Sequence, residues 1–265
     1  MPLTRRHIGA TLDQSNFAAT RMKKFFRDYI GGQPACYPTG ATGGYGTPSG
    51  STGATNGFKT QEASYEYHVK GTGETLLSPT WDAANGLLFG LDLADNEGVE
   101  ITAGIGALDL GSFVVGTDRG FYAKASIRIA DVSGTDEFLF GFRKNQAYQT
   151  AHTAYTDYAA IGAVTSADPA AIQIKTRLNS GTAVTVNTTK TWADTEVHSV
   201  AVHVKDDGRV RFLLDDAEPP VTKTDFIFDA GDTVNWFLFW IYATTTPGAV
   251  HARLFEWGYI PRRGE

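Results

Sequence analysis

Three clusters of acidic residues are the first place in this sequence where catalytic chemistry could reside. The clusters are Asp131/Asp136/Glu137, Asp206/Asp207 and Asp215/Asp216/Glu218. Retaining hydrolysis of a glycosidic bond needs two carboxyl groups about 5 to 5.5 Å apart, which same-face positions on one strand can supply. All three clusters lie near Gly or Pro, where turns are expected. We therefore interpret them as solvated turns and predict no catalytic residue.

A metal site is the second possibility. Oxygen ligands of the type that calcium prefers occur close together at Asp92, Asp95, Asn96 and Glu97. Their spacing fits no standard calcium loop, and the six histidines are scattered along the chain, with a single cysteine to join them in a zinc site. The sequence also lacks a P-loop, a G-x-S-x-G motif and a dinucleotide fingerprint. We therefore predict no metal and no cofactor.

Tryptophan side chains could stack on sugar rings. Trp236 and Trp240 lie in the most apolar stretch of the chain, "VNWFLFWIY", and are expected in the core. Trp192 lies in the turn-like stretch "KTWADTE". It is the residue that we consider as a platform for a glycan.

The sequence that must position these residues divides into an N-terminal arm, 1–61, and a globular domain, 62–265. Polar capping candidates, apolar residues at helical spacing and a Gly31-Gly32 stop predict one short amphipathic helix over about 15–30. The segment 37–61 is rich in Gly, Thr and Ser and is predicted to be extended. A helix this short is marginal alone in water, so it needs a surface, either on its own domain or on a neighbouring subunit.

Charge is distributed unevenly along the chain. The net charge is −6, yet residues 1–30 carry six basic residues against two acidic ones. Basic arms bind nucleic acid or acidic protein surfaces, and charge alone does not choose between them. The single cysteine, Cys36, and the lack of a signal-peptide pattern predict assembly in a reducing compartment. No run approaches the roughly 18 apolar residues that span a bilayer, so we expect no membrane partner.

The domain shows the period-two alternation of β-strands. In "FYAKASIRIA", every second residue from Phe121 to Ile129 is apolar, and "HSVAVHV" and "VRFLL" flank a "KDDGR" turn as a hairpin. "VNWFLFWIY" is apolar on both faces, which predicts a central strand. Short strands with hairpin turns predict an all-β fold, an antiparallel β-sandwich or jelly roll, preceded by the extended arm with its helix.

The strand order and the phrase W-x5-H-S-V-x-V-x-V…D-G-x-V-x-F-L-L-D, from Trp192 to Asp215, carry a family resemblance. Over roughly residues 75–260 the chain resembles the concanavalin-A-like lectin/glucanase jelly roll, in the form found in virion proteins of tailed bacteriophages. The E-x-D-x-x-E pattern of the glucanases is absent, so we expect no enzyme.

The resemblance implies a capsid decoration or cement protein that binds the major capsid protein and stabilises the head. It would be assembled in the host cytoplasm, lie on the outer capsid surface of the virion and form a homo-oligomer such as a trimer, without direct contact with nucleic acid. Basic residues of the arm would match an acidic coat surface and apolar residues would supply buried area. These coat-binding residues are Arg5, Arg6, Phe17, Arg21, Met22, Lys23, Lys24, Phe25, Phe26, Arg27 and Tyr29. The alternative is a carbohydrate-binding module that attaches the virion to its host.

Overall fold

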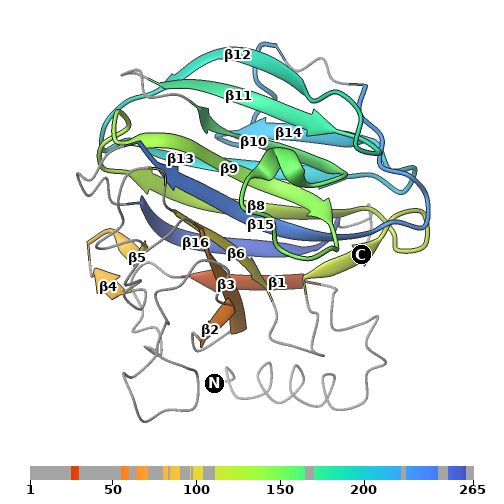
Figure 1. Cartoon of the computed structure of the whole chain (residues 1–265), viewed down its shortest axis with the longest axis horizontal. Helices are drawn as coiled ribbons and strands as arrows, with labels where there is room; N and C mark the ends of the chain where they lie inside the picture. The colour runs from red at the N-terminus through yellow and green to blue at the C-terminus, as the bar shows by residue number, and fades with distance from the viewer. Residues whose placement is uncertain are drawn as a thin grey trace, which may run out of the picture.

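The protein folds as two antiparallel β-sheets packed face to face (Figure 1). The computed structural model describes residues 25–29, 55–59, 64–70, 80–82, 84–89, 96, 98–103, 111–164, 170–221, 225–243 and 250–260. The predicted all-β antiparallel sandwich is confirmed. The part of the chain that the structure describes contains no helix long and apolar enough to cross a membrane.

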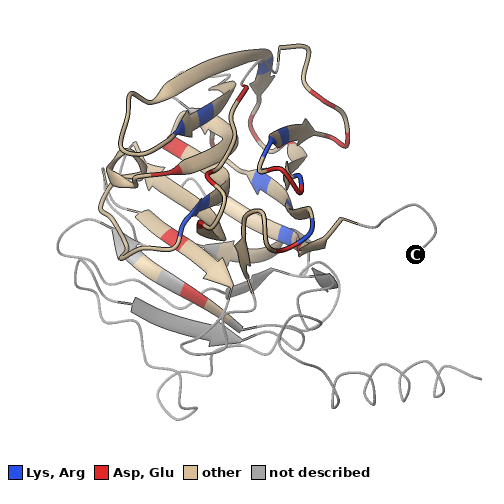
Figure 2. Ribbon diagram, turned by 90° about the vertical axis from the view of Figure 1, so that its right-hand side faces the viewer, with Lys and Arg blue, Asp and Glu red and all other residues tan. Residues whose placement is uncertain are grey.

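The first sheet has seven strands. They are β1 (Phe25–Tyr29), β4 (Thr80–Asp82), β5 (Gly86–Phe89), β8 (Phe121–Ile129), β13 (Val197–Val204), β14 (Val210–Leu214) and β16 (Val250–Tyr259). Their spatial order is β14-β13-β8-β16-β5-β4, and β1 pairs with β16. Basic and acidic positions are interleaved along the described strands rather than gathered by sign (Figure 2).

The second sheet has nine strands and carries the features discussed below. They are β2 (Thr55–Lys59), β3 (Ser64–Lys70), β6 (Gly98–Ala103), β7 (Ser112–Val114), β9 (Thr135–Lys144), β10 (Tyr158–Val164), β11 (Ala170–Arg177), β12 (Val184–Trp192) and β15 (Thr233–Tyr242). Their order is β12-β11-β10-β9-β15-β6-β3-β2, with β7 paired to β15. One short 3-10 helix, η1 (His152–Ala154), lies between β9 and β10.

Alternating apolar residues build the core between the sheets. On β8 the side chains of Phe121, Ala123, Ala125, Ile127 and Ile129 are buried in this core, as the alternation predicts. The β13–β14 hairpin is confirmed as well, with Val204 paired to Val210. Gly208 in its turn has a φ of +82°, and a Cβ at this position would lie 2.5 Å from the carbonyl oxygen of Phe228. The turn therefore requires glycine.

Strand β15 lies between β9 and β6 and is covered on both faces, as predicted. Trp236 and Trp240 point into the core between the sheets. Phe237 and Phe239 point to the opposite face, where they form a second apolar cluster with Leu139, Tyr155, Tyr158 and Ala160. The outer face of the nine-stranded sheet is therefore covered at its centre, not open to water.

The predicted helix over 15–30 is wrong at its C-terminal end. Phe25–Tyr29 forms strand β1, in which Phe25 lies opposite Gly258 and Tyr29 opposite Leu254 of β16. The aromatic residues of "FFRDY" suit a strand, and pairing with β16 outweighs a helical spacing that is only a weak preference. The remainder of the predicted helix lies outside the described residues.

A segment of the predicted extended tract also belongs to a sheet. Thr55–Lys59 forms β2 and pairs with β3, with Phe58 opposite Tyr65. The boundary placed between residues 61 and 62 lies outside the described residues, so the division into arm and domain stays a prediction.

The interpretation of Trp192 as a glycan platform is wrong. Its side chain has no exposed surface and belongs to the core. Its ring contacts Phe138 and His198 edge-on, at centroid distances of 5.5 and 4.6 Å, and its Nε1 donates to the carbonyl oxygen of Glu196. The turn begins after this residue, so Trp192 ends β12 with an inward side chain.

The substitution Trp192→Ala tests this placement. We expect a loss of about 3–5 kcal/mol in the free energy of unfolding because a large buried side chain is removed. Urea unfolding measures it. Val184→Ala is the matched control, since Val184 lies on the same strand and is half exposed; its effect should stay within about 0.5 kcal/mol. Equal effects of the two substitutions would contradict the placement.

Candidate functional site

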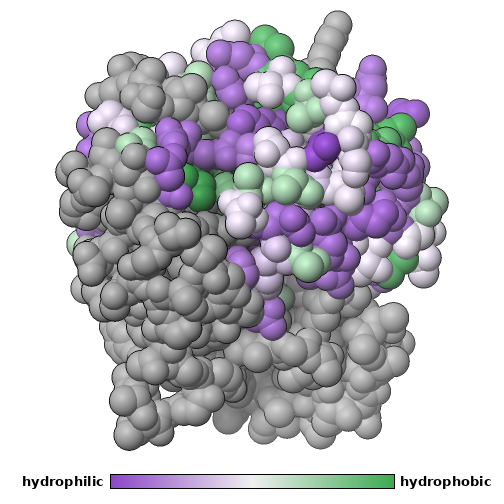
Figure 3. All heavy atoms as spheres, in the orientation of Figure 1, coloured by the Kyte–Doolittle hydropathy of each residue, from purple (hydrophilic) through white to green (hydrophobic). Residues whose placement is uncertain are grey.

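The segment 145–157, which connects β9 to β10 and contains η1, folds back over the outer face of the nine-stranded sheet (Figure 1). Its side chains reach three strands. Tyr148 bonds to Thr102 of β6 and Glu66 of β3, and the ring of His152 lies 5.8 Å from that of Phe239 on β15. The described surface in this view is mainly hydrophilic, with small scattered apolar spots (Figure 3).

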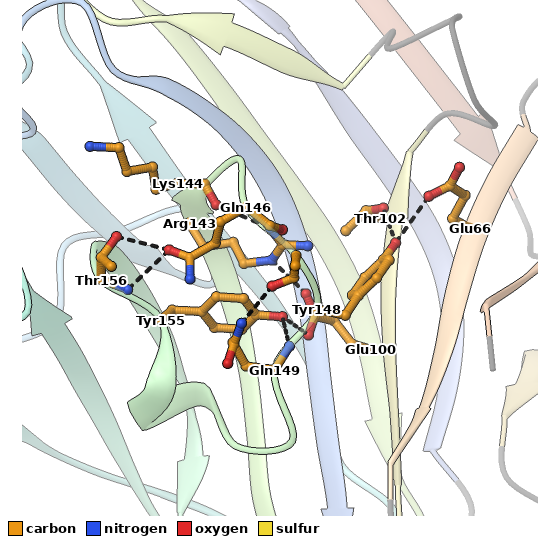
Figure 4. A network of polar contacts seen from close by, with 11 residues as sticks. Glu66, Glu100, Thr102, Arg143, Lys144, Gln146, Tyr148, Gln149, Tyr155 and Thr156 are labelled. Atoms are coloured by element: carbon orange, nitrogen blue, oxygen red, sulfur yellow. Dashed lines mark hydrogen bonds and ion pairs between the residues drawn. The ribbon is translucent and has the colours of Figure 1, made fainter. Parts of the chain in front are cut away.

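A buried ion pair lies beneath this segment. The Nε of Arg143 on β9 donates to the Glu100 carboxylate of β6 at 2.5 Å, and the two side chains are 3% and 0% exposed (Figure 4). The second carboxylate oxygen of Glu100 accepts a hydrogen bond from the Tyr155 hydroxyl. Burial lowers the pKa of Arg143, but the adjacent Glu100 carboxylate outweighs that effect and raises it. Arg143 therefore stays cationic, and both carboxylate oxygens of Glu100 accept hydrogen bonds.

Two tyrosines enclose the Arg143 guanidinium. Its carbon lies 5.2 Å from the ring centre of Tyr148 and 4.6 Å from that of Tyr155, within the range of cation–π attraction. Burial and the nearby carboxylates raise the pKa of both phenols, so both stay protonated and can donate. Tyr148 also stacks on His68 at 4.5 Å. His68 is 8% exposed, and the Tyr148 ring of this segment covers it.

A second ion pair attaches η1 to the sheet. Glu137 of β9 is bound by His152 Nδ1 at 2.5 Å and by Lys175 Nζ at 2.6 Å. Burial raises the pKa of Glu137, but the bonds and charges of His152 and Lys175 outweigh it, and the pKa lies below its ordinary value. Asp136 and Glu137 were expected in a solvated turn, which is wrong because both lie in strand β9. Asp206, Asp207, Asp215 and Asp216 do lie in turns and are exposed.

A polar hollow of about 440 Å³ opens where the segment rejoins the sheet. We refer to this cavity as the hollow. The residues that line it are Lys144, Asn145, Gln146, Thr156, Asp157, Asn179 and Ser180. Asp157 has no exposed surface, and its carboxylate accepts bonds from the Asn179 amide at 2.6 Å and the Thr156 hydroxyl at 2.6 Å. The two sides of the hollow are thus joined through one carboxylate.

The turn between β11 and β12 forms one wall of the hollow in a strained backbone conformation. Asn179 and Ser180 have φ values of +50° and +57°. Asparagine tolerates this left-handed region, but serine adopts it at a cost. The turn is held by the bond from Ser180 N to Thr156 O at 2.9 Å and by Arg177, which donates to the carbonyl oxygens of Ser180 and Gly181.

Charge within the hollow is largely compensated. Lys144 Nζ lies 2.6 Å from Asp232 and 3.7 Å from Asp157. The hydrogen bond that Lys144 donates to Asp232 is the main reason that the pKa of Lys144 is raised. The Asn179 side-chain amide donates to Asp229 at 2.7 Å. Among the described lining residues, the one cation, Lys144, has carboxylate partners.

None of the predicted binding residues that the structure describes lies at this site. Arg5, Arg6, Phe17, Arg21, Met22, Lys23 and Lys24 lie outside the described residues. Phe25, Phe26, Arg27 and Tyr29 lie on β1, in the seven-stranded sheet. Of the segment proposed for calcium, only Asn96 is described, and no three His, Cys, Asp or Glu among the described residues are grouped to hold a metal ion.

The sequence alone does not predict the hollow. Two signals were present: the polar run "KNQ" directly after a buried strand, and "NSG" between two alternating strands. Each is typical of an ordinary turn. Only their meeting in space, through Asp157, makes them one site.

Comparison with known proteins gives distant similarities of fold. No family model and no curated protein sequence matches the chain. Among solved structures, the carbohydrate recognition domain of Emp47p is 11% identical, with a TM-score of 0.46 over 73% of this chain and 88% of that one. The Ca²⁺-bound exoplasmic/lumenal domain of VIP36 is 8% identical, with a TM-score of 0.48 over 75% and 84%. The carbohydrate-binding module CBM66 from Bacillus subtilis is 12% identical, with a TM-score of 0.36 over 68% and 91%. These similarities are too distant to carry a functional argument.

The Glu137 ion pair predicts a specific dependence of stability on pH. Because its folded pKa is depressed, its stabilisation is present above the unfolded pKa of about 4.3 and is lost as pH falls through the folded pKa. Glu137→Gln should cost about 1.5–3 kcal/mol at pH 5–6 and progressively less toward pH 3. Urea unfolding of both proteins across this range measures the difference. A difference that stays constant with pH would contradict the assignment.

Proposed function

We propose that this protein is a non-catalytic binding protein whose ligand is a neutral saccharide held in the hollow. The observation that carries the proposal is the lining: all seven residues are polar, and together they supply both donors and acceptors. A sugar hydroxyl donates and accepts hydrogen bonds, and the amides of Asn145 and Gln146 and the hydroxyl of Ser180 do the same. The volume falls within the roughly 300–1,000 Å³ of small-molecule sites.

Charge compensation favours a neutral ligand over an acidic one. Lys144 is the only cationic side chain among the seven lining residues, and Asp232 and Asp157 neutralise it. An anionic ligand would have to compete with these carboxylates. A neutral, hydroxyl-rich ligand needs only hydrogen bonds, which the remaining lining side chains supply.

The geometry of the hollow supports binding without turnover. Asp157 is the one carboxylate among the lining residues, and both of its oxygens already accept bonds from the protein. Hydrolysis of a glycosidic bond requires two carboxyl groups that flank the scissile bond. The strain at Ser180 fits a preformed binding site, because a rigid wall lowers the entropy lost on binding.

The capsid-decoration role remains a second candidate, together with its coat-protein partner, homo-oligomer and outer-capsid location. It rests on the family resemblance and on the six basic against two acidic residues of 1–30. A saccharide-binding hollow would suit the host-adhesion form of this role. Co-sedimentation with empty coat shells, with and without residues 1–24, tests it while leaving β1 in place.

Two substitutions test the proposed saccharide site. Asn145→Ala removes an exposed amide and should weaken binding about tenfold, or about 1.4 kcal/mol. Ser180→Gly should raise the free energy of unfolding by about 0.5–1 kcal/mol, because glycine adopts positive φ freely, yet weaken binding by removing the hydroxyl. A glycan array identifies ligands, and calorimetry gives the dissociation constants.

Thr195→Gly is the matched control. Thr195 also has a positive φ, +64°, but belongs to the turn between β12 and β13. It should gain stability without any change in affinity. The proposal fails if the wild-type protein binds no neutral glycan, or if Asn145→Ala and Ser180→Gly bind as tightly as the wild type.

A further inference from the structure

We infer that the buried Glu100–Arg143 pair positions the hollow, and that its role is to shape the binding site rather than to stabilise the fold. The inference rests on the proposed function for its binding readout. Neither residue lines the hollow. Each would act through the main chain that does, which makes them positioning residues.

The connection from the ion pair to the hollow runs through Arg143. While its Nε holds Glu100, its Nη1 donates to the carbonyl oxygens of Lys144 at 3.1 Å and Gln146 at 3.3 Å (Figure 4). Gln146 in turn accepts a bond at its side-chain oxygen from the Thr156 main-chain amide at 3.1 Å, and the Thr156 hydroxyl oxygen lies 2.8 Å from the same atom. One guanidinium therefore fixes the lining residues at 144–146, and through them Thr156.

Glu100 fixes the same segment a second time. Its other carboxylate oxygen is bound by the Tyr155 hydroxyl, and Tyr155 also accepts a bond from the Gln149 amide at 3.1 Å. Tyr155 immediately precedes Thr156 and Asp157 of the hollow. The carboxylate thus sets both ends of the segment 145–157 relative to the sheet.

The surroundings of the pair indicate that stability is not its purpose. In the strand register Glu100 lies opposite Phe239 on one side and His68 on the other, and Arg143 lies opposite Tyr158 and Asn235. Phe239 and Tyr158 belong to the apolar cluster on this face. Apolar side chains at these two positions would pack against Phe239 and Tyr158 without desolvating two charges. Replacing a buried ion pair by apolar residues of similar volume is often neutral or stabilising.

Arginine is required here for its geometry. It has separate donors for the carboxylate and for the two carbonyl oxygens, in a fixed planar arrangement. Lysine could keep the charge beside Glu100 but could not hold all three acceptors in the same directions. The charge and the positioning can therefore be separated by substitution.

The test replaces both members of the pair, Glu100→Leu with Arg143→Met, in the full chain. We expect a melting temperature equal to or above that of the wild type, and amide hydrogen exchange at least tenfold faster over residues 145–157. Affinity for neutral hexasaccharides, with maltohexaose, cellohexaose and mannohexaose as probes, should fall at least tenfold. Arg143→Lys should retain the ion pair and still show the same increase in exchange and the same loss of affinity. This variant replaces the double variant in the test if the double variant does not fold.

The control is the exposed pair Arg211–Glu218, whose side chains are 54% and 42% exposed. Arg211→Gln with Glu218→Gln should leave exchange and affinity unchanged. Unchanged exchange over 145–157 in the double variant and in Arg143→Lys would overturn the inference. The inference would also be overturned if the variants lost affinity only to the extent that they lost free energy of unfolding. If the wild type binds none of the three probes, the proposed function fails, and the exchange result still decides whether the pair positions the segment.

Discussion

The carboxylate of Glu100 is the constraint on which the functional face of this protein depends. It lies on a central strand with no exposed surface, and a buried carboxylate is stable only where charged and hydrogen-bonding partners surround it. Arg143 lies near the end of β9, just before the connection to β10 begins, and Tyr155 lies near the end of that connection. Satisfying this one charge therefore folds the connection onto the sheet. The hollow forms where the connection turns back into β10.

The sandwich supplies the rigidity that such a site needs. Strands β9 and β15 have apolar residues on both faces, so their positions are set by two layers of packing. Lys144 ends β9, and the other six lining residues lie within three residues of a strand end, in the connection 145–157 and in the β11–β12 turn. Sites held by rigid elements and supporting hydrogen bonds keep their geometry before the ligand arrives. The strained Ser180 persists because Arg177 and Thr156 hold its peptide groups.

Much of the fold could be predicted from the sequence, since burial repeats with the period of a strand. The alternation of β8, the β13–β14 hairpin and the two-sided burial of β15 are all of this kind. The prediction was wrong where pairing partners decide the structure. Phe25–Tyr29 has apolar residues at helical spacing, but it pairs with β16, which lies more than 200 residues later in the chain. Trp192 was misplaced because a strand end and a turn differ by one residue.

The site could not be predicted for a related reason. Glu100, Arg143 and Tyr155 are separated in sequence, and none stands in a recognisable motif. Glu100 lies in "GVEITA", where an acidic residue in an alternating strand indicates a wet face. It is buried because a segment some fifty residues later covers it. Polar residues that are brought together by a segment distant in sequence leave no local sequence pattern that predicts their contact.

The most direct test of the central claim is an NMR titration of isotope-labelled protein with the three neutral hexasaccharides. We expect the amide shifts to concentrate at Asn145, Gln146, Thr156, Asn179 and Ser180 and to fade with distance from the hollow. Shifts that concentrate on the seven-stranded sheet, or no shifts with any of the three sugars, would contradict the central claim.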